Sequence, residues 1–272
     1  MRIATWNINS LKARQDRAEE WIAYAEPDVL CFQETKLADS AFPAMVFGAM
    51  GYESVHYGNG RWNGVAILSR VGIEDVMTGF ADGADDRAPT EDGTEGEPEC
   101  RIVSATCGGV RVMSVYVPNG RVVGSIHYEA KLAWLGRLRA HLDKTVDPSG
   151  LAVVCGDFNV APEDRDVYDI TKFSDDTHVT PAERAALREV QDFGLEDAFR
   201  RCYPDEGKLF SWWDYRAGNF HKGFGMRIDL ELATKPLADK ASFALIDRNA
   251  RKGGMTDKPP SDHAPLFVDY DV

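Results

Sequence analysis

Six strand-like runs of this 272-residue chain end in clusters of carboxylate, amide or histidine side chains. Asparagine and aspartate are common turn formers, so each cluster taken alone fits an ordinary loop. Six together point to one shared site, because ligands bind where the loops at strand ends converge. Their oxygen atoms suit a hard divalent cation and acid–base chemistry. The clusters are Trp6-Asn7-Ile8-Asn9, Gln33-Glu34-Thr35-Lys36, Tyr116-Val117-Pro118-Asn119-Gly120, Gly156-Asp157-Phe158-Asn159, Arg227-Ile228-Asp229 and Ser261-Asp262-His263.

Two of the clusters place polar side chains at alternating positions. Asp157 and Asn159 are separated by one residue, as are Asn7 and Asn9. In extended backbone such pairs point to the same face, so a carboxylate and an amide can reach the same substrate group. His263 stands in a third cluster, beside an acid, where a histidine is either structural or suited to stabilising negative charge.

The elements that must position these clusters are short β-rich runs alternating with helical stretches. Residues 11–25 and 126–142 carry apolar side chains at helical spacing, and a capping-box pattern opens another helix at Thr180 that runs to about residue 193. Gly108-Gly109 predicts a tight antiparallel hairpin, whereas helices separate other runs, so we expect mixed sheets faced by helices. The predicted strands are 3–8, 29–33, 65–69, 101–106, 110–117, 151–155, 228–233 and 266–269.

Length and composition indicate a single α/β domain spanning residues 1–272, since no linker or repeat divides the chain. No apolar run approaches the roughly 20 residues of a membrane helix, and the first residues lack a signal-peptide pattern. We therefore expect a cytoplasmic monomer without a membrane partner. The five cysteines include no C-x-x-C pair and are expected to be reduced core thiols.

The formal net charge of −13 argues against a nucleic-acid partner, because binding a phosphate backbone usually needs a basic face. The charge is unevenly distributed, however. Residues 74–99 hold ten acids against one base, Arg87, and so contribute −9 of the total. Residues outside 74–99 therefore carry only −4. Residues 82–98 are rich in glycine, proline and acids and are expected to form a solvated loop.

The six clusters, in this order, resemble the exonuclease III and apurinic/apyrimidinic (AP) endonuclease family, within the endonuclease/exonuclease/phosphatase superfamily. The resemblance extends from Ile3-Ala4-Thr5-Trp6-Asn7 to Ser261-Asp262-His263-Ala264-Pro265. The segment Ser211-Trp212-Trp213-Asp214-Tyr215-Arg216, followed by Met226-Arg227-Ile228-Asp229, is typical of its DNA-repair branch. The resemblance implies a four-layer α/β/β/α sandwich of two mixed sheets, the DNase I-like fold.

The activity that the resemblance implies is divalent-metal-dependent cleavage of DNA in base excision repair. It comprises 3′-to-5′ exonuclease action on double-stranded DNA and incision 5′ to abasic sites. Hard oxygen ligands favour Mg²⁺, or Mn²⁺, as the cofactor. Glu34 would hold the cation, helped by Asn7 and by Asp262 through water.

The resemblance also implies roles for the remaining polar residues. Asp157, held by Asn159, would orient and deprotonate the attacking water. His263, oriented by Asp229, would donate to a non-bridging phosphate oxygen. Tyr116 would contact the same phosphate from another side.

The substrate residues implied by the resemblance are mostly apolar. Trp212, Met226 and Ile228 would wall a pocket for a flipped-out abasic sugar, which leaves room that a normal base would overfill. Without the resemblance, Trp212 is as easily a core aromatic. Asn9 and Arg227 would contact the DNA, and further basic candidates for phosphate contacts are Lys36, Arg61, Arg121, Arg216, Lys222, Arg248, Arg251, Lys252 and Lys258.

Two alternatives stay open at this point. The same superfamily core serves enzymes that act on phosphoinositides, sphingomyelin or RNA tails, and the tryptophan segment at residues 211–216 favours DNA over these. A binding module that kept the fold and lost catalysis would lack Glu34 or Asp157, and both are present.

Overall fold

The computed structural model describes residues 1–173, 176–252 and 258–272, and within them two six-stranded sheets are paired face to face. Residues 174–175 and 253–257 lie outside the described residues. The first sheet has the strand order β11 (Ala241–Ile246), β12 (Leu266–Tyr270), β1 (Arg2–Asn7), β2 (Val29–Gln33), β4 (Val65–Ser69), β3 (Glu53–Tyr57). The second has the order β5 (Glu74–Thr78), β6 (Ile102–Cys107), β7 (Val110–Tyr116), β8 (Ala152–Asp157), β10 (Asp229–Thr234), β9 (Leu195–Asp197).

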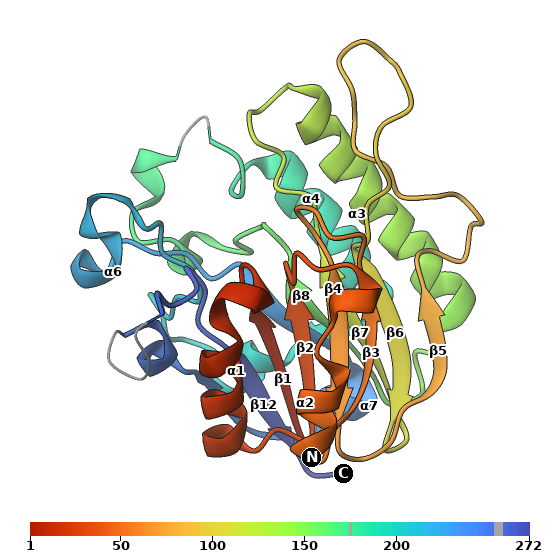
Figure 1. Cartoon of the computed structure of the whole chain (residues 1–272). Coiled ribbons are helices and arrows are strands. Elements are labelled where there is room, and N and C mark those ends of the chain that lie inside the picture. Colours follow the sequence, from red (N-terminus) through yellow and green to blue (C-terminus); the bar gives the residue numbers. More distant parts are fainter. Residues whose placement is uncertain (174–175, 253–257) are drawn as a thin grey trace.

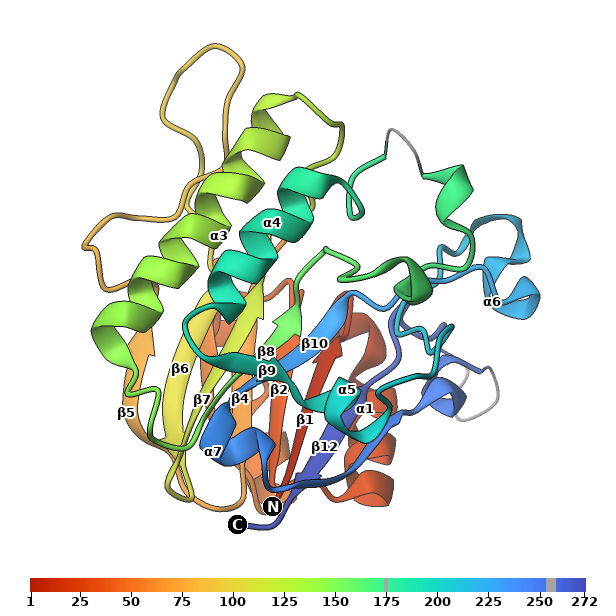
Figure 2. The same cartoon turned by 180° about the vertical axis from the view of Figure 1, so that it is seen from behind.

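Helices cover the outer face of each sheet and complete four layers. Helices α1 (Leu11–Ala25) and α2 (Ala44–Ala49) lie on the first sheet, and α3 (Ile126–Thr145) and α4 (Pro181–Gln191) on the second (Figures 1 and 2). One apolar cluster fills the space between the sheets, and two others fill the spaces under the helices. The remaining helical turns are short: α5 (Ala198–Cys202), α6 (Asn219–Lys222), α7 (Lys235–Ala238), η1 (Asp39–Ala41), η2 (Asp164–Asp166), η3 (Ile170–Lys172), η4 (Arg216–Gly218) and η5 (Arg248–Arg251). The four-layer α/β/β/α prediction is confirmed.

The sheets are mixed, as predicted. β1 pairs in parallel with β2, and β7 with β8, whereas the β6–β7 hairpin at Gly108-Gly109 is antiparallel. The eight predicted strands correspond to the eight inner strands. The four strands that the sequence did not indicate, β3, β5, β9 and β11, are the sheet edges. Edge strands face solvent on one side, and β3, β5 and β11 bury few side chains, so the apolar pattern that predicts a strand is weak there.

The predicted helices are present. Ser125 caps α3 by accepting from the Tyr128 amide, and Thr180 and Glu183 form the expected capping box at the start of α4. Trp134, Leu135, Leu138 and Leu142 of α3 are buried against the second sheet. The two helices are joined by an ion pair between Lys131 of α3 and Glu183 of α4, whose side chains are both fully buried.

Acid is expected to weaken this link between α3 and α4. Burial raises the pKa of Glu183, but the charge and hydrogen bond of Lys131, together with hydrogen bonds from Thr177 and the His178 amide, outweigh burial and lower the pKa to about 2. A carboxylate with a depressed folded pKa stabilises the fold above its unfolded pKa, near 4.5, and loses that contribution as pH falls towards 2. Urea denaturation should therefore show Glu183→Gln less stable than wild type at pH 7, with the gap closing below pH 4. A gap of constant size between pH 6 and pH 3 would contradict this assignment.

Other features of the sequence have mixed outcomes. The five cysteines are all free and four of them are buried, as predicted. Residues 82–98 form a largely exposed loop, as predicted, and the structure adds that Asp82 and Asp86 pair with Arg137 of α3. Within the described part of the chain, none of the helices has the length and apolar character to cross a membrane.

Candidate active site

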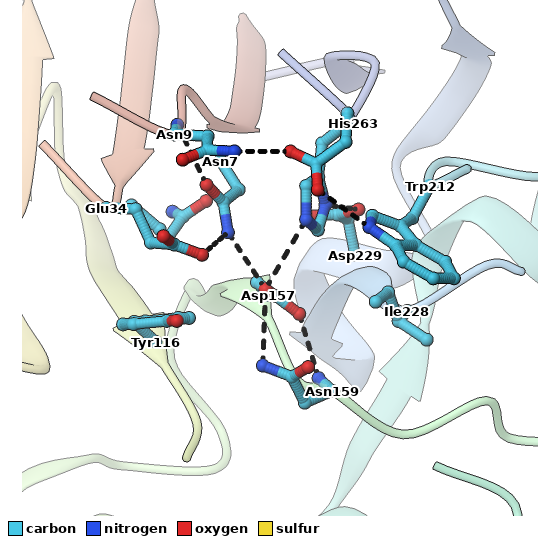
Figure 3. Close-up of polar contacts among 12 residues, drawn as sticks. Asn7, Asn9, Glu34, Tyr116, Asp157, Asn159, Trp212, Ile228, Asp229 and His263 are labelled. Carbon is cyan, nitrogen blue, oxygen red and sulfur yellow. Dashed lines mark hydrogen bonds and ion pairs between the residues drawn. The ribbon is translucent and has the colours of Figure 1, made fainter. Parts of the chain in front are cut away.

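The predicted polar residues meet at one end of the two sheets because of the strand directions. β1 and β2 are parallel and end at Asn7 and just before Glu34, while β7 and β8 are parallel and end at Tyr116 and Asp157. β10 and β12 run antiparallel to β8 and β1, so the residues at or before their starts arrive at the same end. These are Asp229, at the start of β10, and His263, before β12. Figure 3 shows the resulting group of side chains, drawn from both sheets.

Asp157 is the centre of this group and is almost fully buried. Its Oδ1 accepts from the Asn159 backbone amide (2.9 Å), and its Oδ2 accepts from Asn7 Nδ2 (2.9 Å) and Asn159 Nδ2 (3.3 Å). The Asn7 bond crosses between the two sheets. Burial, with smaller contributions from Asp229 and Glu34, raises the pKa of Asp157 to about 7. A carboxylate with this pKa can accept a proton near neutral pH.

The residue before Asp157 must be glycine. A Cβ at Gly156 would lie 1.9 Å from the carbonyl oxygen of Val115 on the neighbouring strand. Glycine therefore allows β8 to approach β7 closely at the point where Asp157 enters the site.

His263 faces Asp157 and is held from behind by Asp229. His263 Nδ1 lies 2.8 Å from Asp229 Oδ2, and its Nε2 lies 3.8 Å from Asp157 Oδ2. Burial lowers the pKa of His263, but the two carboxylates outweigh burial and raise it to about 10. The ring is thus charged at neutral pH, with its Nε2 proton directed into the site, and the predicted Asp229–His263 pairing is present.

Glu34 lies beside this group and opens onto a cavity of about 360 Å³. Its Oε1 accepts from Asn7 Nδ2 (2.8 Å), its Oε2 lies 3.0 Å from Lys36 Nζ, and 17% of its side chain is exposed. Tyr116 lines the same cavity, and burial next to Glu34 raises the pKa of its hydroxyl well above the usual value. The Tyr116 hydroxyl therefore keeps its proton and remains a hydrogen-bond donor.

Several non-glycine residues of the site have left-handed backbone. Their φ angles are 45° at Asn9, 50° at Glu34, 55° at Lys36 and 51° at Asn159. Such conformations are uncommon outside glycine, are tolerated best by asparagine, and cluster at functional sites. At Glu34 the surrounding turn is held by main-chain hydrogen bonds from residues 35 and 36 to residues 64 and 63.

Comparison with known proteins agrees with this geometry. Residues 4–263 match the model of the endonuclease/exonuclease/phosphatase family. The chain belongs to this family. It is 31% identical to exodeoxyribonuclease III of Haemophilus influenzae, over 99% of this chain and all of that protein.

Solved structures place the chain in the exodeoxyribonuclease III and AP endonuclease branch of the family. It is 37% identical to an AP endonuclease from Archaeoglobus fulgidus, with a TM-score of 0.90 over the whole of both chains. It is 34% identical to the 3′–5′ exonuclease NExo from Neisseria meningitidis, with a TM-score of 0.91, again over both whole chains. The chain is accordingly a hydrolase of this branch.

In this family member, Glu34 is the residue around which a divalent cation would fit. No group of three or more His, Cys, Asp or Glu side chains that could hold a metal ion occurs among residues 1–173, 176–252 and 258–272. Mg²⁺ in enzymes is commonly held by one or two carboxylates with waters and substrate phosphates, and the Glu34 carboxylate, open to the cavity, fits that arrangement.

Asn7 and Asp262, the other predicted metal residues, are engaged in hydrogen bonds. The Asn7 amide turns its nitrogen, and not its oxygen, towards Glu34 and Asp157, while its Oδ1 accepts from the Asn9 backbone (3.0 Å). Asn7 thus orients both carboxylates in this structure. The Asp262 oxygens accept from Asn9 Nδ2 (2.8 Å) and Trp212 Nε1 (3.1 Å). Its role as a ligand through water stays a prediction.

The apolar wall predicted for the abasic sugar is partly exposed. Trp212 is half-buried and lines a cavity of about 250 Å³ with Met226, which is itself 2% exposed. Ile228 is equally buried and lies in the apolar cluster against which Trp212 packs. Sequence reasoning missed the other aromatic residues of this cavity, Tyr168, Phe173 and Phe224, because they come from segments without a recognisable motif.

The prediction that Arg227 contacts substrate is wrong. Its side chain is fully buried, with Nε 2.7 Å from Asp166 Oδ1 and Nη1 2.7 Å from Asp197 Oδ2. A guanidinium paired with two carboxylates inside the fold has no free face for a phosphate. Because side chains alternate along an extended strand, Arg227 points to the opposite side from its neighbours Met226 and Ile228.

Basic residues do line the cavity next to Glu34. Lys36 and Arg121, both among the candidates from the sequence, lie there with His127. Arg101, which the sequence did not single out, packs its guanidinium 4.7 Å from the centre of the Tyr116 ring. The charged lining thus consists of three bases, Lys36, Arg101 and Arg121, and two acids, Glu34 and Glu99, and the bases can contact a phosphate ligand.

Proposed function

We propose that the chain is a divalent-metal-dependent DNA phosphodiesterase with 3′-to-5′ exonuclease action and incision 5′ to abasic sites, as in base excision repair. The observation that carries this proposal is the placement of Asp157, with a pKa of about 7, between two asparagine amides and the charged His263. This arrangement provides a base and a proton donor close to each other, next to a cavity whose lining includes Lys36, Arg101 and Arg121.

The chain's own residues divide the hydrolysis between them. Asp157, held by Asn7 and Asn159, orients a water molecule and accepts its proton as the water oxygen attacks phosphorus. The bond from phosphorus to the leaving O3′ breaks, and that oxygen takes up a proton from solvent. His263, fixed by Asp229, donates a hydrogen bond from Nε2 to a non-bridging oxygen as negative charge builds, and the Tyr116 hydroxyl donates a hydrogen bond to the same phosphate. A divalent cation, when bound near Glu34, supplies neutralisation of that charge.

Double-stranded DNA is the substrate that best suits the rest of the site. The cavity lined by Trp212 is small and combines aromatic walls with polar side chains such as Lys172 and Asn219, which suits a base-free sugar with its hydroxyl groups. An abasic nucleotide also has little stacking to lose on leaving the duplex. Lys36 and Arg121 line the neighbouring cavity, where they can contact backbone phosphates.

Removal of a terminal 3′ phosphate is a second candidate activity. One solved relative, 34% identical over the whole chain, is described as the 3′ phosphatase NExo from Neisseria bound to a product DNA hairpin. The same base, proton donor and cation would serve a phosphate monoester, since the reacting phosphorus and its oxygens are common to both substrates.

Three duplexes separate these activities in one assay. They carry a single internal abasic analogue, a 3′ hydroxyl end or a 3′ phosphate end, and each is incubated with Mg²⁺, with Mn²⁺ or with EDTA. We expect metal-dependent incision at the abasic analogue and 3′ shortening. Folded protein that leaves all three duplexes intact in either metal would refute the proposal.

Replacing Glu34 with glutamine is expected to weaken cation binding. Loss of the Glu34 carboxylate, which opens onto the cavity beside Asp157, should raise the Mg²⁺ concentration for half-maximal cleavage at least about 10-fold. Mn²⁺ binding measured by electron paramagnetic resonance should weaken in parallel, without DNA present. Glu97→Gln, which alters an exposed acid of the loop that pairs with Arg61, is the control and should leave both values unchanged.

A further inference from the structure

A buried cation lies behind the catalytic group and has no role in the hydrolysis as described. Lys131 of α3 is fully buried, and its partner Glu183 accepts hydrogen bonds as well from Thr177 Oγ1 (2.6 Å) and the His178 amide (2.9 Å). Lys131 Nζ also donates to the carbonyl oxygen of Asn159 (2.6 Å). The ammonium therefore contacts the residue that holds Asp157.

Asn159 is held at every polar atom. Its backbone amide and its Nδ2 donate to Asp157, Nδ2 also donates to the Val117 carbonyl (3.0 Å), and Oδ1 accepts from Asn119 Nδ2 (3.0 Å). Its carbonyl oxygen points away from the substrate side, towards Lys131 and His178 Nδ1 (2.6 Å). The backbone at Asn159 is left-handed, with φ of 51°, which is an uncommon conformation. The hydrogen bonds to its carbonyl oxygen stabilise that conformation.

The same ammonium reaches the second loop of the site. Lys131 Nζ lies 3.3 Å from the carbonyl oxygen of Asn119, in the segment that follows β7 and Tyr116. One cation thus binds the loop after β7 and the loop after β8. These loops directly follow Tyr116, the proposed phosphate donor, and Asp157, the proposed base, so the same ammonium anchors the backbone next to both.

A stabilising role alone does not account for this ion pair. Buried ion pairs are often no more stabilising than apolar residues of similar volume, because both charges lose their hydration. Apolar side chains, however, could not donate to two carbonyl oxygens at once. We propose that Lys131, held by Glu183, is a positioning residue that fixes the Asn159 and Asn119 loops and so sets the place of Asp157 against the scissile phosphate. This inference rests on the proposed function, because it concerns the geometry of that hydrolysis.

The test measures kcat and KM of purified full-length variants on whichever duplex the wild type cleaves, at a temperature where circular dichroism shows each variant folded. Lys131→Met removes the donor, Lys131→Arg keeps a cation that can donate, and Leu138→Ala destabilises the same helix without touching the loops. Loss of a residue that orients another typically costs about 10- to 100-fold, and we expect this loss in kcat of Lys131→Met with KM changed less than about threefold. Lys131→Arg should recover most of kcat, and Leu138→Ala should keep it.

Lys131→Met leaves the Glu183 carboxylate buried without its cation, so it can fail to fold. In that case the double variant Lys131→Met/Glu183→Gln removes both charges, and its glutamine can still form the capping box at the start of α4. The same loss of kcat is expected for the double variant. A kcat within about twofold of wild type in the folded variant, an effect confined to KM, or an equal loss in Leu138→Ala would overturn the positioning role alone. A wild type that cleaves no duplex would overturn the proposed function, and this inference with it.

Discussion

Asp157→Asn is expected to lower the rate of DNA cleavage by about 100- to 10,000-fold, the usual contribution of a general base. Asparagine keeps the shape of the side chain and one acceptor oxygen for the Asn159 backbone amide, while the base is lost. Its amide nitrogen would face the Asn7 and Asn159 side-chain amide nitrogens, so circular dichroism is used to select conditions under which the variant is folded. Single-turnover cleavage of the abasic duplex measures the rate directly. A variant that cleaves at the wild-type rate would show that another group deprotonates the water.

The pH dependence of the wild type provides an independent check on Asp157. Its pKa is raised to about 7, mainly by burial, so the active ionised form increases as pH rises through that value. We expect the single-turnover rate to rise with pH to about 8, and the residual rate of Asp157→Asn to lack this rise. Because Asp157 and His263 interact closely, the observed values belong to the pair.

His263→Gln is expected to reduce kcat by about 100- to 1,000-fold, as for the loss of one donor to a developing oxyanion. Glutamine can still donate one hydrogen bond but carries no charge, and Asp229 loses its cationic partner. The KM for DNA should change far less than kcat, because the contact strengthens in the transition state.

A matched comparison separates the charge of His263 from its position. Asp229→Asn leaves the histidine in place but removes the carboxylate that most strongly raises its pKa to about 10. Without this carboxylate the pKa of His263 should fall, so the histidine loses its proton at a lower pH. The decrease in rate at high pH should therefore begin at a lower pH in Asp229→Asn than in the wild type. If that decrease does not move while kcat falls, Asp229 acts by holding the ring and not by keeping it charged.

Much of the fold could be predicted because its inner strands bury both faces. Continuous apolar runs such as 65–69 and 152–155 are typical of strands that are buried on both faces. The four layers follow from the alternation of such strands with amphipathic helices. The edge strands could not be predicted in this way. In β5, for example, Asp75 and Val76 are both exposed, so the sequence shows no alternation to identify the strand.

The candidate site divides along a similar line. The placement of Asp157, Asn159, His263 and Glu34 follows from motifs at strand ends, and the structure brings all four together. Arg227 shows the limit of such reasoning. It sits within a motif that resembles a substrate pocket, but its partners Asp166 and Asp197 lie 61 and 30 residues away in the sequence, and only the folded chain brings them to it.

By itself the sequence determined which side chains could carry out phosphate chemistry, since residue types and their local spacing depend on no distant contact. Only the tertiary structure decided how each is used. The Asn7 amide faces Glu34 and Asp157, the latter 150 residues away, with its nitrogen, and Lys131 reaches the carbonyl behind Asn159 from a separate helix. An amide orients, and a buried charge pairs, according to the groups that the packed layers bring within about 3 Å. Those groups come from distant parts of the chain, so the local sequence does not predict them.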